Sequence, residues 1–199
     1  MASTEGLLFS SERLLVVLRC VIEDKKLKKI MKDLNNLTPA GIRAKYEETH
    51  IRNFVEFHML MTGGGKSVSK MKIGELKGAS EGDDGLWVVN VIDQKTTKFG
   101  PSSVTFIMPK LYRAALKFVR AFRGNSDDEE LVFVNSTGRE LDLKICSSWM
   151  KTNYLAEVLT KEEFHHFTPK IWQQAWTKWA SQASHSNIKE LAAKVMGPI

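Results

Sequence analysis

The spacing of apolar residues changes twice along this chain, and this change limits the possible folds more than any other feature. Residues 86–93 (LWVVNVID) and 102–108 (SSVTFIM) are rich in β-branched and aromatic residues, and the turn-forming segment QKTTKFGP separates them. This pattern predicts a β-hairpin. On both sides of it the apolar residues recur at helical spacing. We therefore expect an α+β fold that is mostly α, with a helical N-terminal part, a small antiparallel sheet and C-terminal helices.

Two amphipathic helices are predicted before residue 37. The apolar face of the first consists of Leu14, Leu18, Val21 and Ile22, and Ser10 or Ser11 can cap its start. The apolar face of the second consists of Leu27, Ile30, Met31 and Leu34, spaced i, i+3, i+4 and i+7. We therefore divide the chain into an N-terminal tail with helices, residues 1–36, and a main domain, residues 37–199.

Helical patterns return at several places in the main domain. Thr38 and Pro39 form a typical helix start, and we expect one long helix from there to about Met61. Two short helical turns follow within residues 66–80. The pattern then predicts a helix at 109–123, a short strand at 131–135, and helices at 142–159, 169–184 and 186–196.

The charge of the chain favours a polyanionic partner. The formal net charge is +6 and the isoelectric point is near 9.3, which points to nucleic acid first and to an acidic membrane surface second. The polar face of the second helix holds Lys25, Lys28, Lys29 and Lys32. Two interpretations stay open for this face: it is simply solvated, or it contacts phosphates.

Other compositional features bear on the compartment. No apolar run approaches the roughly 18 residues that span a bilayer, so we expect no membrane insertion, and no signal peptide is evident at the start. Cys20 and Cys146 form no metal or redox motif. We therefore expect an intracellular protein in a reducing compartment.

Most motifs of enzymatic or metal sites are absent from the sequence, and we expect neither a cofactor nor a metal. The GGGK segment resembles a phosphate cradle but follows a predicted helix rather than a strand. His165 and His166 have no further ligand at metal spacing, and His58 is expected at the edge of the core. The three tryptophans at i, i+4 and i+7, which are Trp172, Trp176 and Trp179, form either core packing or an exposed partner surface.

Three blocks of sequence resemble a known family. They read LWVVNVIDQKTTKFGPSSVTFIMPKLYRAALKFVRAFR, then LVFVNSTGREL, then FTPKIWQQAWTKWA followed later by VMGPI. In this order they resemble the catalytic domain of tyrosine recombinases, especially the transposon-derived Crypton-like branch. The resemblance covers about residues 37–199 and implies a recombinase-like fold.

In that family a tyrosine attacks a DNA phosphate, and two arginines, a lysine and histidine or tryptophan residues stabilise the charge that develops on the phosphoryl oxygens. The resemblance matches Lys95 to the lysine of the family, Lys170 to a histidine and Pro198 to a late histidine. The position of the first arginine is held by Gly64 or Gly65, beside Lys66. The position of the second arginine is held by Gln173 or, in a shifted register, by Trp172. No tyrosine stands where the nucleophile would follow. Because lysine does not replace arginine at a bidentate phosphate site, the resemblance implies an inactive pseudoenzyme.

We therefore expect a non-catalytic DNA-binding module that grips duplex DNA through a lysine-rich face. The candidate contact residues are Lys66, Lys70, Lys95, Lys98, Lys170, Gln173, Lys28, Lys29 and Lys32. One alternative is a domesticated protein-interaction or regulatory domain that uses exposed aromatic residues and the acidic DDEE loop. A second alternative is an active recombinase that receives its nucleophile from another chain. We expect a monomer located in the nucleus rather than the cytoplasm.

Overall fold

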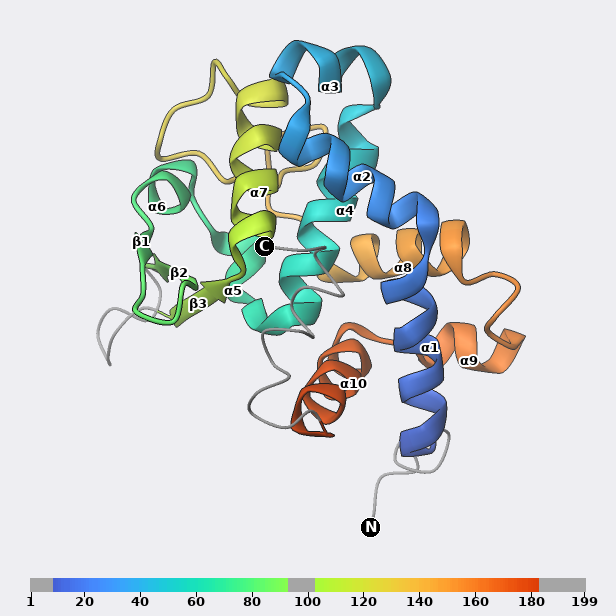
Figure 1. The fold of residues 1–199 in the computed structure, drawn as a ribbon. Helices are drawn as coiled ribbons and strands as arrows, with labels where there is room; N and C mark the ends of the chain where they lie inside the picture. Colours follow the sequence, from blue (N-terminus) through green and yellow to red (C-terminus); the bar gives the residue numbers. More distant parts are fainter. Residues whose placement is uncertain (1–8, 93–102, 183–199) are drawn as a thin grey trace.

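The computed structural model describes residues 9–92 and 103–182 and has the predicted α+β class, with helices predominating over one small sheet (Figure 1). The helices of these two ranges are α1 (Ser11–Glu23), α2 (Lys25–Asn36), α3 (Pro39–Lys45), α4 (Glu48–Met59), the π-helical turn η2 (Leu60–Gly64), α5 (Ser67–Lys70), α6 (Ile73–Lys77), α7 (Pro109–Phe122), α8 (Leu143–Tyr154), α9 (Lys161–His166) and α10 (Pro169–Gln182). The strands are β1 (Ser80–Glu81), β2 (Trp87–Val91) and β3 (Ser103–Ile107).

The two N-terminal helices form as predicted. Ser10 caps α1 by accepting a hydrogen bond from the backbone N–H of Arg13 at 3.1 Å, and Asp24 caps α2 in the same way. The four apolar residues predicted for α2 are all buried. Helix α1 packs against α10 and α2 packs against α7, so one hydrophobic core includes the N-terminal helices and the main domain.

The single long helix predicted from Pro39 to Met61 is wrong. Helix α3 ends at Lys45, and Tyr46 adopts an extended conformation with φ −131° and ψ 144°. The Tyr46 hydroxyl donates to Asp33 Oδ2 of α2 at 2.6 Å. This tertiary contact lies at the interruption, where local helical periodicity would have continued the helix. A second helix, α4, then runs to Met59 and ends in the π-helical turn η2.

The predicted hairpin is confirmed and has one more strand beside it. Strands β2 and β3 pair antiparallel with Val89 opposite Thr105, and both of these residues are buried. Strand β1 adds to the outer edge of β2 and was not predicted. The strand predicted at 131–135 does not form, because this segment makes only isolated bridges, Lys72 with Leu131 and Val134 with Glu140.

The C-terminal part differs from prediction at element ends. Helix α8 stops at Tyr154 rather than 159. A short helix, α9, was not predicted, and His165 and His166 lie in its last turn. The predicted helix at 169–184 is confirmed as α10, whereas the one at 186–196 lies outside the described residues.

The tryptophan stripe of α10 belongs largely to the core. Trp172 is fully buried, and its indole Nε1 donates to Ser147 Oγ of α8 at 2.9 Å. Trp176 and Trp179 are partly buried, and their ring centroids are 5.1 Å apart. Core packing is therefore the correct interpretation for Trp172.

Candidate nucleic-acid interface

The predicted DNA-contacting residues fall into two separate groups. Lys66 follows η2 and Lys70 ends α5, while Lys170 and Gln173 lie in the first turns of α10. Lys28, Lys29 and Lys32 are exposed on α2. Lys95 and Lys98 lie outside the described residues.

The first group surrounds a junction between η2 and α10. A Cβ atom on Gly65 would lie 3.7 Å from Gln173 Nε2, and this amide also approaches the Leu60 carbonyl oxygen at 3.4 Å. If Gly65 is taken as the first of the two positions that the recombinase resemblance assigns to arginines, these positions lie side by side, and neither residue is a cation. In the shifted register the second arginine position would belong to Trp172, which lies inside the core.

The hairpin reaches the same junction. Strand β3 and helix α10 both pack against η2. Ser67 Oγ and Thr105 Oγ1 are 2.9 Å apart and share a hydrogen bond, which ties α5 to β3. Strand β3 and helix α10 therefore meet at the π-helical turn η2, while Lys95 lies outside the described residues.

The second group lies on α2, where the lysine side chains point away from the core. The exposed lysines of this helix are Lys25, Lys26, Lys28, Lys29 and Lys32. The single acid of α2, Asp33, accepts hydrogen bonds from Lys45 and from the Tyr46 hydroxyl. Burial raises the pKa of Asp33, but these two hydrogen bonds outweigh burial and hold the pKa below its usual range. The acid is therefore already neutralised from the α3 side.

A basic stripe on α7 extends this surface, and it was missed from the sequence. Its members are Lys110, Arg113, Lys117 and Arg120, which are spaced i, i+3, i+7 and i+10 on one helical face. The signal was visible in PKLYRAALKFVRAFR, but only the apolar residues of that segment were used to predict a helix. What the sequence could not show is that the stripe lies beside α2.

Asn35 joins the two helices. Arg113 Nε donates to Asn35 Oδ1 at 3.0 Å, and Asn35 Nδ2 donates to the Lys110 carbonyl at 3.2 Å. Lys28, Lys32 and Asn35 share one face of α2 because they are spaced i, i+4 and i+7. The lysine row therefore runs into the α7 stripe. We call these six cations the basic seam: Lys28, Lys32, Lys110, Arg113, Lys117 and Arg120.

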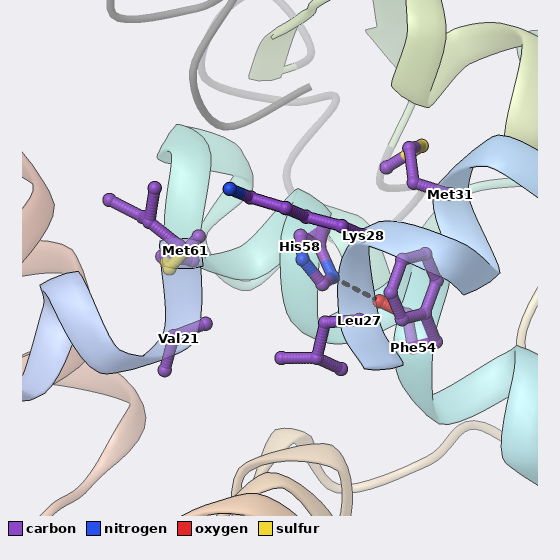
Figure 2. Close-up of a pocket in the computed structure, with 8 residues that line it drawn as sticks. Val21, Leu27, Lys28, Met31, Phe54, His58 and Met61 are labelled. Atoms are coloured by element: carbon purple, nitrogen blue, oxygen red, sulfur yellow. Dashed lines mark hydrogen bonds between the residues drawn. The ribbon is translucent and has the colours of Figure 1, made fainter. Parts of the chain in front are cut away.

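A small cavity lies beneath Lys28, between α1, α2, α4 and η2 (Figure 2). Its volume is about 10 Å³, which is room for about one water molecule. His58 lines it, with Nδ1 2.7 Å from the Phe54 carbonyl oxygen. Burial lowers the pKa of His58 to about 4, which the bond to Phe54 offsets in part. His58 is thus a neutral core residue, and Figure 2 shows the Lys28 side chain passing over it.

A buried carboxyl group lies on the other side of α4. Both oxygens of Glu56 are buried and have no hydrogen-bond partner within the described residues. Burial raises the pKa of Glu56 to about 8, although the Arg52 guanidinium opposes the shift. Burial also raises the pKa of the Cys146 thiol, with the Glu56 carboxylate as the second cause. These groups belong to the packing of α4 against α8 rather than to the surface.

Two further observations limit the chemistry of the chain. In the part that the structure describes, no three His, Cys, Asp or Glu side chains gather as metal ligands would. Among residues 9–92 and 103–182 there is also no helix that is both long and apolar enough to cross a bilayer.

Comparisons with protein-family models, with curated proteins and with solved structures found no match to this chain. The resemblance to tyrosine recombinases therefore stays a prediction from the quoted sequence blocks.

Proposed function

We propose that this chain is a duplex-DNA-binding module that does not cleave DNA. One observation supports binding above the others: three helices that pack together hold more positive charge than the whole chain has in excess. Helices α2, α3 and α7 contain eleven Lys or Arg residues and one acid, and α7 packs against both α2 and α3 (Figure 1). Because the whole chain has a net charge of only +6, the remainder is net negative, so the charge is segregated rather than dispersed.

Duplex DNA is the partner that suits such a surface. Its backbone presents about one negative charge per 1.7 Å of helix axis, and each Lys or Arg that neutralises a phosphate releases counterions. Contacts of this kind determine affinity and position but convey little sequence information. We therefore expect binding that depends strongly on salt and weakly on base sequence.

The absence of cleavage follows from the junction between η2 and α10. Transfer of a DNA phosphoryl group needs fixed cations at the oxygens where charge develops. In the recombinase resemblance, Gly64 or Gly65 and Gln173 stand at the positions of the two arginines, and neither residue carries a positive charge. Lys66 and Lys170 are exposed nearby, but a lysine does not provide the planar bidentate fork of arginine.

The proposal is tested by fluorescence anisotropy with nuclease-treated protein and two unrelated 25-base-pair duplexes. We expect both duplexes to bind with similar affinity at 50 mM salt and to bind much more weakly at 200 mM. A nicked suicide duplex should give no covalent adduct on a denaturing gel. No binding of either duplex at 50 mM would contradict DNA binding and favour the protein-interaction alternative, and a covalent adduct would contradict the absence of cleavage.

A further inference from the structure

We infer that the basic seam, and not the junction of Gly65 with Gln173, is the surface that holds the DNA backbone. This inference rests on the proposed function and names the surface that performs it. The recombinase resemblance implies the opposite placement, over the junction. The charges and contacts of α2 and α7 favour the seam.

The seam has a length that matches a run of phosphates. From Lys110 to Arg120 the α7 stripe rises by about 15 Å at about 1.5 Å per residue. Successive phosphates of one DNA strand advance by about 3.4 Å along the duplex axis. The four cations of α7 therefore lie along about four to five phosphates of one strand. Lys28 and Lys32 extend the surface across α2, because their row meets the stripe at Asn35.

The local electrostatics of the seam show crowded positive charge without compensation. Helix α7 contains no acid, and Asp33 of α2 is already bound by Lys45 and Tyr46. Burial lowers the pKa of Lys110, and the nearby Arg113 guanidinium lowers it further. A phosphate placed over the seam would relieve this repulsion between like charges.

Two of the cations are held in place before any ligand binds. Arg113 is fixed by its bond to Asn35, and the Lys117 ammonium donates to the Leu37 carbonyl. Ordering these side chains in advance reduces the conformational entropy that binding would otherwise cost. The opposite face of α7 is buried through Leu111, Ala115 and Phe118, so the basic stripe is the face of α7 that a ligand can reach. The seam therefore contacts the backbone, which predicts weak sequence preference.

The decisive experiment compares two triple variants of the full chain that have the same net charge. The seam variant is Lys32→Gln, Lys110→Gln and Arg120→Gln, whose side chains form no hydrogen bond or ion pair with any described residue. The control variant is Arg139→Gln, Lys144→Gln and Lys161→Gln, at exposed positions outside α2, α3 and α7. A third variant, Lys66→Gln with Lys170→Gln, tests the junction. Anisotropy at 100 mM salt with a 25-base-pair duplex reports affinity, and far-ultraviolet circular dichroism with thermal unfolding confirms that each variant is folded.

We expect the seam variant to lose on the order of 500-fold in affinity, because each of its three lost phosphate contacts contributes about eightfold through counterion release at this salt. The control and junction variants should stay within about threefold of the wild type. Equal losses in the seam and control variants would overturn the inference, since net charge alone would then explain binding. A loss confined to the junction variant would overturn it as well, while leaving the proposed function intact. If the wild-type chain binds no duplex, the proposed function and the inference both fail.

Discussion

Gly65 lies directly beside Gln173, so that a Cβ atom on the glycine would be 3.7 Å from the amide Nε2. Space is therefore available for a side chain at this position, and the backbone is what restricts it. Gly65 has φ 52° and ψ −151°, a region that residues with a Cβ atom rarely adopt. The glycine fixes the turn between η2 and α5, beside α10.

We expect Gly65→Ala to lower the free energy of unfolding by about 1–3 kcal/mol, because the alanine must adopt a strained backbone conformation. Adding Gln173→Ala should not rescue the loss, since the contact is of ordinary length and the cost lies in the backbone. Gly138→Ala is the comparison, because Gly138 also has positive φ (76°) and nothing lies within 4 Å of a Cβ atom there, so it shows the cost of the backbone alone. Urea unfolding measures all three. Full rescue by the second substitution would show that crowding, rather than backbone strain, is the cause.

The buried carboxyl of Glu56 makes stability depend on pH above neutrality. Its pKa is raised from 4.5 to about 8 by burial, so the folded protein retains a proton that the unfolded chain releases. The stability that this proton provides is complete below pH 4.5 and is lost as the pH rises to 8. Between pH 6.5 and 8 we expect the free energy of unfolding to fall by up to about 1.4 kcal/mol per pH unit. Glu56→Gln should abolish this fall, whereas Glu157→Gln, at an exposed site, should leave it unchanged.

His58 has the opposite effect on the acid side. Burial lowers its pKa from 6.5 to about 4, so the unfolded chain binds a proton that the folded protein excludes. Its contribution to stability is present above pH 6.5 and is lost as the pH falls to 4. Between pH 4.5 and 6.5 the effects of His58 and Glu56 oppose each other, so the stability of the wild type should depend less on pH there than above pH 6.5. His58→Phe should remove the compensation, so that stability falls steadily from pH 4.5 to 8. A variant that kept the weaker pH dependence of the wild type below pH 6.5 would contradict this balance.

The contact between α1 and α9 depends on one arginine. Arg13 donates from Nε and from a terminal nitrogen to the two carboxylate oxygens of Glu163, both at 2.7 Å, and also to the Val158 carbonyl at 2.7 Å. A lysine cannot reproduce this fork, so Arg13→Lys should cost about 1–2 kcal/mol by thermal or urea unfolding. Lys77→Ala removes the exposed pair with Asp128 and should cost less than about 0.5 kcal/mol. If Arg13→Lys and Lys77→Ala lowered the free energy of unfolding equally, the bidentate contact of Arg13 with Glu163 would stabilise the protein no more than a surface ion pair does.

The helices that could be predicted from sequence are those whose caps and apolar spacing agree. Helix α2 has Asp24 at its N-cap and four buried apolar residues at i, i+3, i+4 and i+7, and its prediction is confirmed. The break at Tyr46 could not be predicted, because the interaction accompanying it is a hydrogen bond to Asp33 in another helix. The helical spacing of the apolar residues alone predicts a helix that continues past Tyr46.

The candidate interface was only partly visible in the sequence for a similar reason. The lysine row of α2 follows from helical spacing, and so does the basic stripe of α7. That the two rows form one surface depends on the hydrogen bond between Asn35 and Arg113, which are 78 residues apart in the sequence. Likewise, the meeting of Gly65 with Gln173 arises from packing of η2 against α10 and leaves no local signal.

The central claim is that this chain binds the DNA backbone through many phosphate contacts. Its most direct test is the slope of log affinity against log salt concentration between 50 and 200 mM, measured on two duplexes of unrelated sequence. With the six cations of the seam engaged, we predict a slope of about −5 for both duplexes, since each phosphate contact contributes about −0.9. A slope near zero, or affinity for one duplex only, would contradict the account.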